Sequence, residues 1–529
     1  MQTTCKHWET SYSRRPSATL TALWRTGIGS VCFLLAAAAS PAQDEKLSPN
    51  VVKFKVLASF NGANGNVISG LNPVQGTDGS LYGTTRFGGA FGAGTIYRIT
   101  PAGALTTIYS FCAETNCPDG AVPNPSGALA LSTDGNFYGA TTSGGPNAGY
   151  CPYAPVGCGT VFKITPSGAL TTLHEFCLQP NCTDGDLSQG GVIRGDDGNF
   201  YGVTTGGGAN INSMCDNGFD SGCGTVFTMT PQGVFNTIHS FCAQANCRDG
   251  GQPYGGLVSG ADGNLYGITD VGGASGFGTI FKITPSGAFT ILHSFDGIDG
   301  NCNLQACAPM VLGADGNLYG TTLAGGSGGS DCLPPGCGTF FKITPEGALT
   351  TLYSFCSKAN CVDGVSPVGI VQATDGNFYG ASNFGGTPGS YGTLFRITPE
   401  GVLTTLHTFD ATDGSTPAGL VQATNGSLYG TASFGGANGD GTVFSLYVGL
   451  GPFVETVPSS AKVGRGVRIL GTNLADATAV DFNGSAAKFI IVSRTEILTE
   501  VPAGATTGFI TVTTPTETLT SNMKFRVRP

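Results

Sequence analysis

The sequence predicts an all-β protein: a seven-bladed β-propeller closed by its N-terminal strand, followed by a small immunoglobulin-like β-sandwich. Two observations predict this fold. A unit of the kind found at residues 262–295, DGNLYGITDVGGASGFGTIFKITPSGAFTILHSF, recurs through residue 449, and the chain from residue 452 onward lacks it. Repeats of about 58 residues fit four-stranded propeller blades with some enlarged loops.

Each repeat begins with a tight turn followed by an aromatic residue. The seven pairs are Asp78/Tyr82, Asp134/Tyr138, Asp197/Tyr201, Asp262/Tyr266, Asp315/Tyr319, Asp375/Tyr379 and Asn425/Tyr429. In the 262–295 unit we expect strands at 256–258, 265–267, 279–283 and 289–295. Apolar and polar residues alternate in 279–283, as in a half-buried strand, and Asp-Gly and Thr-Pro-Ser-Gly are turn sequences.

The two ends of the repeat region complement each other. The last copy stops after its third strand, at residues 441–447, whereas residues 51–60, VVKFKVLASF, resemble a fourth strand placed before the first complete copy. A closed ring can use this offset to leave no free edge, and an open solenoid gains nothing from it. The sequence therefore predicts that the N-terminal strand completes the last blade.

The N-terminus predicts export. Residues 1–42 combine basic residues, an apolar run at 28–39 and Ser-Pro-Ala at 40–42, which is typical of a secretory signal peptide, and residues 43–50 form a linker. No later segment approaches the ~20 apolar residues of a membrane-spanning helix. We expect a secreted protein, extracellular or periplasmic and not transmembrane, with association at the cell surface left open.

The charge excludes one class of partner. The first 42 residues hold four basic residues and one acidic residue. The rest of the chain therefore has 20 basic and 33 acidic residues, a net charge of −13 against −10 for the whole sequence. Proteins that bind nucleic acid through phosphates need the opposite sign. We expect no nucleic-acid partner.

The cysteines indicate an oxidising compartment. Sixteen remain after the signal peptide, and all fall into local pairs: Cys112/Cys117, Cys177/Cys182, Cys242/Cys247, Cys356/Cys361, Cys302/Cys307, Cys151/Cys158, Cys215/Cys223 and Cys332/Cys337. The alternative is zinc, but no pair has the two-residue spacing of a zinc knuckle and no histidine accompanies them. We therefore expect disulfides, with no metal and no cofactor.

Strand direction assigns the loops to two faces. The loops between the second and third strands, and those leading from a fourth strand to the next blade, lie on one face, which we call the loop face. It carries every cysteine pair and the insertions at 143–159, 206–224 and 324–338. Loops on a rigid scaffold often carry recognition. The alternative is that insertions are merely tolerated there.

Comparison across the copies argues against a catalytic residue. His174, His239, His293 and His407 occupy one repeat position, which holds Tyr or Ala in other copies, so we expect packing. Acids that recur in nearly every copy are expected to make turns or cap loops, because one active site requires residues that break the symmetry. Asp216, Asp220 and Asp331 do break it. The 216–220 loop lacks the terminal Glu of a calcium loop.

Aromatic residues on the loop face complete the candidate site. The ligand-binding candidates are Phe87, Tyr150, Tyr153, Asp216, Phe219, Asp220, Asp331, Phe384, Tyr391 and Phe434. Exposed rings on rigid loops suit stacking on sugars or gripping a protein. The alternative for Phe87, Phe384 and Phe434 is packing beneath the loops.

Two families resemble parts of this chain. Units of the form DGNLYGTT, GG, GTIFKITPxG and LTTLYSF at 51–449 resemble the GloVer tandem repeat of exported bacterial choice-of-anchor proteins, which implies export and surface display but no reaction. Residues 452–529, with VRILGTNL at 467–474, VDFNG at 480–484 and VPAG at 501–504, resemble an IPT/TIG immunoglobulin-like domain. Short strands separated by turns support a β-sandwich there independently.

The sequence thus predicts a non-catalytic binding or scaffold protein. Its candidate partners are glycans or another envelope or extracellular protein, and its oligomeric state is not determined by the sequence. The alternative is a secreted polysaccharide lyase or glycoside hydrolase using loop carboxylates.

Overall fold

The computed structural model describes residues 52–123, 127–145, 157–215, 222–303, 307–327, 332, 336–386 and 389–529. Their regular structure consists of β-strands and four short 3-10 turns, which confirms the all-β prediction. The predicted signal peptide at 1–42 and the linker at 43–50 lie outside these ranges. No helix in the described part of the chain is long and apolar enough to cross a membrane.

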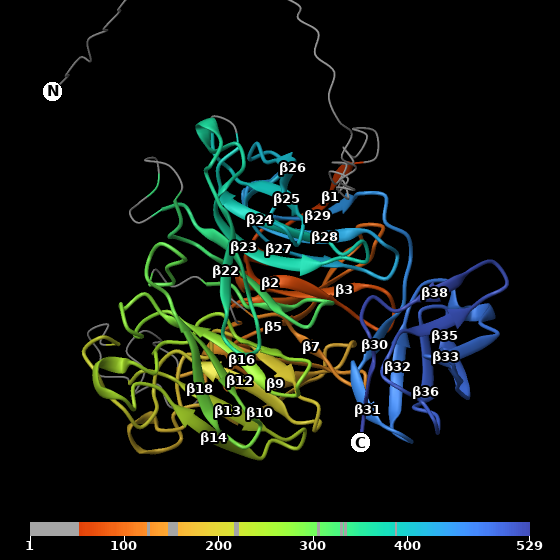
Figure 1. Cartoon of the computed structure of the whole chain (residues 1–529), viewed down its shortest axis with the longest axis horizontal. Helices are drawn as coiled ribbons and strands as arrows, with labels where there is room; N and C mark the ends of the chain where they lie inside the picture. The colour runs from red at the N-terminus through yellow and green to blue at the C-terminus, as the bar shows by residue number, and fades with distance from the viewer. Residues whose placement is uncertain are drawn as a thin grey trace, which may run out of the picture. The chain divides into compact units, whose positions relative to one another are not determined.

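Residues 53–447 form seven antiparallel sheets, which we number in chain order (Figure 1). The first three contain β2 (Asn66–Gln75), β3 (Leu81–Phe87), β4 (Thr95–Ile99), β5 (Leu105–Ser110); β6 (Ala121–Pro123), β7 (Ala130–Leu131), β8 (Phe137–Ser143), β9 (Thr160–Ile164), β10 (Leu170–Glu175); β11 (Val192–Arg194), β12 (Phe200–Thr204), β13 (Thr225–Met229), β14 (Phe235–Ser240). The next three contain β15 (Leu257–Ser259), β16 (Leu265–Thr269), β17 (Thr279–Ile283), β18 (Phe289–Ser294); β19 (Val311–Leu312), β20 (Leu318–Thr322), β21 (Thr339–Ile343), β22 (Leu349–Ser354); β23 (Val365–Gln372), β24 (Phe378–Phe384), β25 (Thr393–Ile397), β26 (Leu403–Thr408). The 3-10 turns between sheets are η1 (Pro180–Cys182), η2 (Ala245–Cys247) and η3 (Ala359–Cys361).

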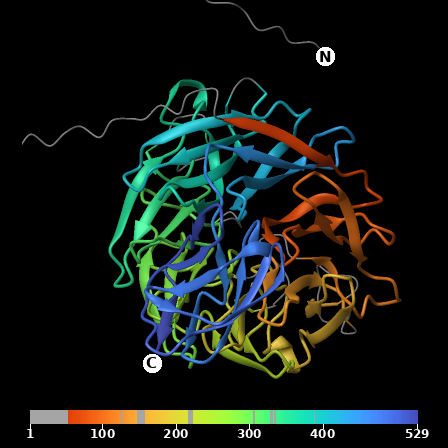
Figure 2. The same cartoon turned by 90° about the vertical axis from the view of Figure 1, so that its right-hand side faces the viewer.

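The seventh sheet combines the two ends of the repeat region. It contains β27 (Ser415–Gln422), β28 (Leu428–Phe434), β29 (Thr442–Tyr447) and β1 (Lys53–Ser59). Strand β1 pairs antiparallel with β29, with Lys53 opposite Tyr447, and the two lie side by side in Figures 1 and 2. Gln75 of β2 adds a second link, because its amide donates to Thr424 Oγ1 (2.9 Å) and accepts from the Thr424 N–H (2.8 Å). The prediction that the N-terminal strand completes the last repeat is confirmed.

Consecutive sheets are joined by a recurrent backbone hydrogen bond. A residue before or within the first strand of a sheet donates its N–H to a carbonyl in the loop between the second and third strands of the preceding sheet. The donor and acceptor residues are Val122 and Ala93, Leu187 and Cys158, Gln252 and Cys223, Cys302 and Phe277, Ser366 and Cys337, and Thr416 and Tyr391. Five of these donors have a backbone φ between 52° and 54°. Residues with β-branched side chains, such as valine and threonine, rarely adopt this left-handed conformation. The backbone geometry therefore repeats where the side chains do not.

The first strands also follow one another in space. Contacts run from β2 to β7, then through β11, β15, β19 and β23 to β27, and β27 contacts β2. The order of contacts thus returns to its start.

Within a repeat, the turn and the core explain the sequence pattern. Tyr266 is 1% exposed and its hydroxyl donates to Asp262 Oδ2 (2.8 Å), which also lies 2.8 Å from Lys282 Nζ. Burial and the neighbouring Asp262 carboxylate raise the pKa of Tyr266 to about 12. A side chain at Gly267 would collide with the ring of Phe281, so glycine is required beneath that ring. These positions are turn and core, as predicted.

The strands of this repeat depart slightly from the predicted bounds. The first is β15, one residue later than 256–258, and the second, β16, extends two residues beyond 265–267. The fourth, β18, ends one residue before Phe295. Phe295 is fully buried and its N–H donates to Gly278 O (3.1 Å), so it turns into the core instead of continuing the strand.

The C-terminal residues form separate sheets on one apolar core. Their strands are β30 (Glu455–Val457), β31 (Ser460–Lys462), β32 (Gly466–Leu470), β33 (Ala479–Phe482), β34 (Ser485–Ala486), β35 (Phe489–Ser493), β36 (Glu496–Glu500), β37 (Ile510–Thr513), β38 (Thr518–Thr520) and β39 (Arg526–Arg528), with turn η4 (Leu474–Asp476). One four-stranded sheet has the order β30-β32-β36-β35 and the other β34-β33-β37-β38, while β31 pairs with β39. Ile469 and Ile497 of one sheet and Phe482 and Ile510 of the other share a single buried cluster.

Candidate functional site

Three phenylalanines stand at equivalent places on the loop face. Phe87, Phe384 and Phe434 are the last residues of the second strands β3, β24 and β28, and they are 40%, 49% and 47% exposed. Their sheets are neighbours, because β27 contacts both β23 and β2. The alternative that these rings pack beneath the loops is wrong, since each is at least 40% exposed.

Two further rings are exposed in the same loops. Tyr391, a predicted candidate, is 38% exposed. Phe91 is 54% exposed and sequence reasoning missed it, although its place shortly after the Gly88-Gly89 pair was a usable signal. The guanidinium of Arg86 lies 5.2 Å from the centroid of the Phe87 ring, at cation–π distance. Among the described residues, the loop face of the first, sixth and seventh sheets thus presents five exposed aromatic side chains.

The other predicted ligand-binding residues lie outside the described residues. They are Tyr150, Tyr153, Asp216, Phe219, Asp220 and Asp331. For these six, the binding role stays a prediction.

Disulfides cross-link the loop face. Seven join described cysteines: Cys112–Cys117, Cys177–Cys182, Cys215–Cys223, Cys242–Cys247, Cys302–Cys307, Cys332–Cys337 and Cys356–Cys361. Cys158 is also disulfide-bonded, and Cys151 lies outside the described residues. Several disulfides in one chain are consistent with an extracellular location.

Recurrent aspartates hold the loops that follow the fourth strands. Asp249 accepts hydrogen bonds from the N–H groups of Ala243 (2.9 Å) and Gln244 (3.1 Å). Asp363 accepts one from the N–H of Ser357 (2.9 Å). These carboxylates cap the loops, as predicted for acids that recur through the repeats.

The histidine position serves packing. His407 stacks on Phe54 with ring centroids 3.7 Å apart, which confirms the predicted packing role. Its Nε2 also lies 2.8 Å from Asp413 Oδ2, a pairing that sequence reasoning missed. Tyr353 makes the equivalent bond to Asp363 (2.7 Å), so tyrosine and histidine substitute for each other here. Burial lowers the pKa of His407 despite the neighbouring Asp413.

Two buried acids break the repeat symmetry and were missed from the sequence. Asp186 is 1% exposed and Asp270 is 2% exposed, and neither carboxylate has a hydrogen-bond partner among the described residues. Burial raises the pKa of Asp186 to about 7, with the nearby Asp184 contributing, and burial raises the pKa of Asp270 well above its usual range. The signal was available for Asp270, because Thr142 and Thr205 occupy its position in two other repeats.

Solved structures show only distant likeness. A protein of unknown function from Bacteroides thetaiotaomicron shares 14% identity with a TM-score of 0.37, over 75% of this chain and 72% of that one. PorZ, a surface component of the type-IX secretion system of Porphyromonas gingivalis, shares 15% with a TM-score of 0.36, over 85% and 64%. A luciferin-regenerating enzyme shares 12% with a TM-score of 0.36, over 76% and 97%. Comparison with curated proteins gives no match.

Family comparisons match nearly the whole described chain. The Gloeobacter/Verrucomicrobia repeat matches residues 45–215, 213–330 and 307–466, and the IPT/TIG domain matches residues 453–527. These matches confirm both resemblances inferred from the repeat units and from the C-terminal motifs. The chain belongs to the Gloeobacter/Verrucomicrobia repeat family and carries a C-terminal IPT/TIG domain.

Proposed function

We propose that residues 51–449 form a seven-bladed β-propeller closed by β1, and that residues 452–529 form an immunoglobulin-like β-sandwich. Seven sheets, the pairing of β1 with β29 and the return of first-strand contacts from β27 to β2 support the propeller. Two sheets sharing one core support the sandwich.

We propose that the protein is secreted or displayed at the cell surface and acts there as a non-catalytic binding protein for carbohydrate. The repeat and IPT/TIG domains fit a surface protein without catalytic activity. Export would follow from residues 1–42 acting as a signal peptide, and the disulfides support an oxidising compartment.

The observation that carries the binding role is the equivalent exposure of Phe87, Phe384 and Phe434. These rings are about half exposed to water. Covering them with a ligand removes apolar surface from water, which contributes favourably to the free energy of binding. Sugar rings present flat C–H faces that suit such covering, and repeat units of a polysaccharide can meet rings placed on neighbouring sheets. The strand ends hold these rings in place before binding, which limits the entropy lost on association.

The test uses the mature chain, residues 43–529, on a glycan array. Wild type is expected to bind at least one polysaccharide class. Replacing the three rings, as F87A/F384A/F434A, is expected to weaken that binding at least about tenfold, because each aromatic contact contributes about 1 kcal/mol.

A matched control separates the loop face from general surface effects. Val234 and Val402 are 68% and 48% exposed and lie in the tight turns between third and fourth strands, on the opposite face. The variant V234A/V402A should bind like wild type. Equal binding by wild type and the triple variant would contradict the proposed site, and binding only to an envelope protein would replace carbohydrate as the ligand.

The enzyme alternative is a polysaccharide lyase or glycoside hydrolase. It requires two carboxylates, or a carboxylate beside Tyr or Arg, in one pocket and roughly 5–10 Å apart. The loop acids that would supply them, Asp216, Asp220 and Asp331, lie outside the described residues. A turnover screen on the same polysaccharides decides between the two: product release would establish an enzyme and overturn the non-catalytic proposal.

A further inference from the structure

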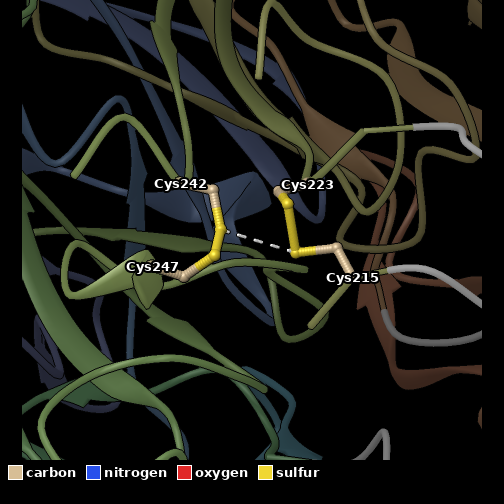
Figure 3. Close-up of side chains that lie close together, drawn as sticks. All are labelled: Cys215, Cys223, Cys242 and Cys247. Carbon is tan, nitrogen blue, oxygen red and sulfur yellow. Dashed lines mark hydrogen bonds between the residues drawn. A yellow bond between two sulfur atoms is a disulfide. The ribbon is translucent and has the colours of Figure 1, made fainter. Parts of the chain in front are cut away.

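Two disulfides of the third sheet lie against each other. Cys215–Cys223 belongs to the loop between the second and third strands, and Cys242–Cys247 to the loop after the fourth strand. The Sγ atoms of Cys215 and Cys242 are 3.7 Å apart, and all four Sγ atoms lie within 4.8 Å of one another (Figure 3). We call these four residues the cysteine quartet.

The same meeting of sulfurs occurs in two other sheets. Cys158, Cys177 and Cys182 of the second sheet, and Cys332, Cys337 and Cys356 of the fifth, each bring three Sγ atoms within the same distance. In contrast, Cys112–Cys117 forms its disulfide without belonging to such a group among the described residues. A loop after a fourth strand therefore closes without a second pair beside it. In the quartet the second pair closes a different loop, the one between the second and third strands, and the two loops bring their sulfurs together.

The geometry points to a tetrathiolate Zn²⁺ site formed by the cysteine quartet when its two disulfides are reduced. A tetrahedral site with Zn–S bonds of about 2.3 Å places its sulfurs about 3.8 Å apart. The non-bonded pair Cys215 and Cys242 already has this separation. Reduction lets the two bonded pairs open toward it by side-chain rotation.

The surroundings of the quartet favour sulfur ligation. The four cysteines are 0–8% exposed, and Val203, Phe241 and Val271 belong to the same buried cluster, so the sulfurs are shielded from bulk water. Four residues separate Cys242 from Cys247, which is within the range of zinc ligand pairs, whereas seven separate Cys215 from Cys223. Gly251 leaves room for the sulfurs, because a Cβ there would lie 2.9 Å from Cys215 Sγ.

The change of state balances with a dithiol as reductant. Two dithiol molecules each reduce one disulfide, giving four cysteine thiols and two oxidised, cyclic dithiols. Zn²⁺ then binds the four sulfurs and four protons are released. Oxidation by a disulfide oxidant reverses the electron transfer and releases the ion. The quartet thus exchanges two cross-links for one metal ion.

The experiment measures metal uptake by the folded mature chain, residues 43–529, after anaerobic reduction with a dithiol and removal of the reductant. Co²⁺ serves as a spectroscopic probe and Zn²⁺ as competitor. We expect sulfur-to-Co²⁺ charge-transfer bands and tetrahedral d–d bands, both removed by Zn²⁺. C215S/C223S is expected to lose about one bound ion per chain, since it removes two of four ligands.

Two controls make the result decisive. C112S/C117S removes a disulfide that belongs to no quartet and should bind as much metal as wild type. Oxidised wild type, which keeps its fold, should bind none at the quartet. Unchanged stoichiometry in C215S/C223S, an equal loss in C112S/C117S, or a reduced wild type that stays folded and binds no Co²⁺ would each overturn the proposal. None of these readouts depends on glycan binding.

Discussion

The first, sixth and seventh sheets hold their loops differently from the second to fifth. Their first strands β2, β23 and β27 have 10, 8 and 8 residues, whereas β11, β15 and β19 have 3, 3 and 2. Long strands pair up to the place where the exposed phenylalanines stand. In the second, third and fifth sheets, the loop between second and third strands instead carries cysteines. Continuous strand pairing supports one group of loops, whereas in the second, third and fifth sheets disulfides are added to shorter pairing.

One repeat position shows the contrast most sharply. In the first sheet Asn66 lies opposite Phe87, an exposed ring. In the third sheet Asp186 lies opposite Gly206, and a side chain on Gly206 would collide with the Asp186 carboxylate. The same backbone position therefore presents a ring to solvent in one sheet and covers a buried acid in another. The scaffold repeats, and the chemistry of its loop face does not.

The largest expected effect tests the packing between the seventh and first sheets. Phe60 is fully buried between the seventh and first sheets, 5.2 Å from the ring of Tyr97. Phe60→Ala should lower the free energy of unfolding by about 3–5 kcal/mol, because it leaves a cavity at the seam. Urea unfolding measures this loss. Phe91→Ala, at an exposed ring, should change stability by less than about 0.5 kcal/mol. Equal losses in the two variants would contradict a packed seam.

The next prediction concerns the pH dependence of stability caused by Asp186, the buried acid of the third sheet. A pKa of about 7 means that folded Asp186 is protonated at pH 4 and ionised above pH 7, whereas the unfolded chain ionises near 3.8. Its contribution to stability is thus lost as pH rises from about 4 to 7. Asp186→Asn should raise the free energy of unfolding at pH 8 by up to about 4 kcal/mol and change it little at pH 4.

Urea unfolding at the two pH values checks this sign. Asp476→Asn, at an exposed carboxylate, serves as the matched control. A loss of stability at pH 8 in Asp186→Asn would mean that the ionised carboxylate has a partner in the fold.

The smallest effect sharpens the distinction between covalent and backbone support. Cys242→Ala/Cys247→Ala should lower the free energy of unfolding by about 2 kcal/mol, because a short cross-link no longer restricts the unfolded chain. Amide exchange should quicken in the loop capped by Asp249. It should stay unchanged in the cysteine-free loop at 410–414, where Asp413 accepts a hydrogen bond from the N–H of Asp410 (3.1 Å). Faster exchange in both loops would show that the two groups are not independently held.

Much of the fold was predictable because it depends on local patterns. The Asp-Gly turns, the buried tyrosines such as Tyr266 and the complementary ends at β1 and β29 are each visible in the sequence. The exposure of Phe87 was not predictable, because apolar alternation is the same for a ring beneath a loop and a ring above it. Asp186 was missed because its neighbour Gly206 is 20 residues away, and nothing local shows that they face each other.

The sequence by itself determined the number of repeats, the approximate place of their strands, the pairing of the cysteines whose partners are both described and the family. Repetition reveals these features because residues close in the chain form turns, hairpins and short cross-links. Only the tertiary structure decided which loops meet: the phenylalanines of neighbouring sheets, and the sulfurs of Cys215 and Cys242. These contacts depend on how separate loops fold over one face. A local sequence pattern does not determine the distance between residues of two such loops.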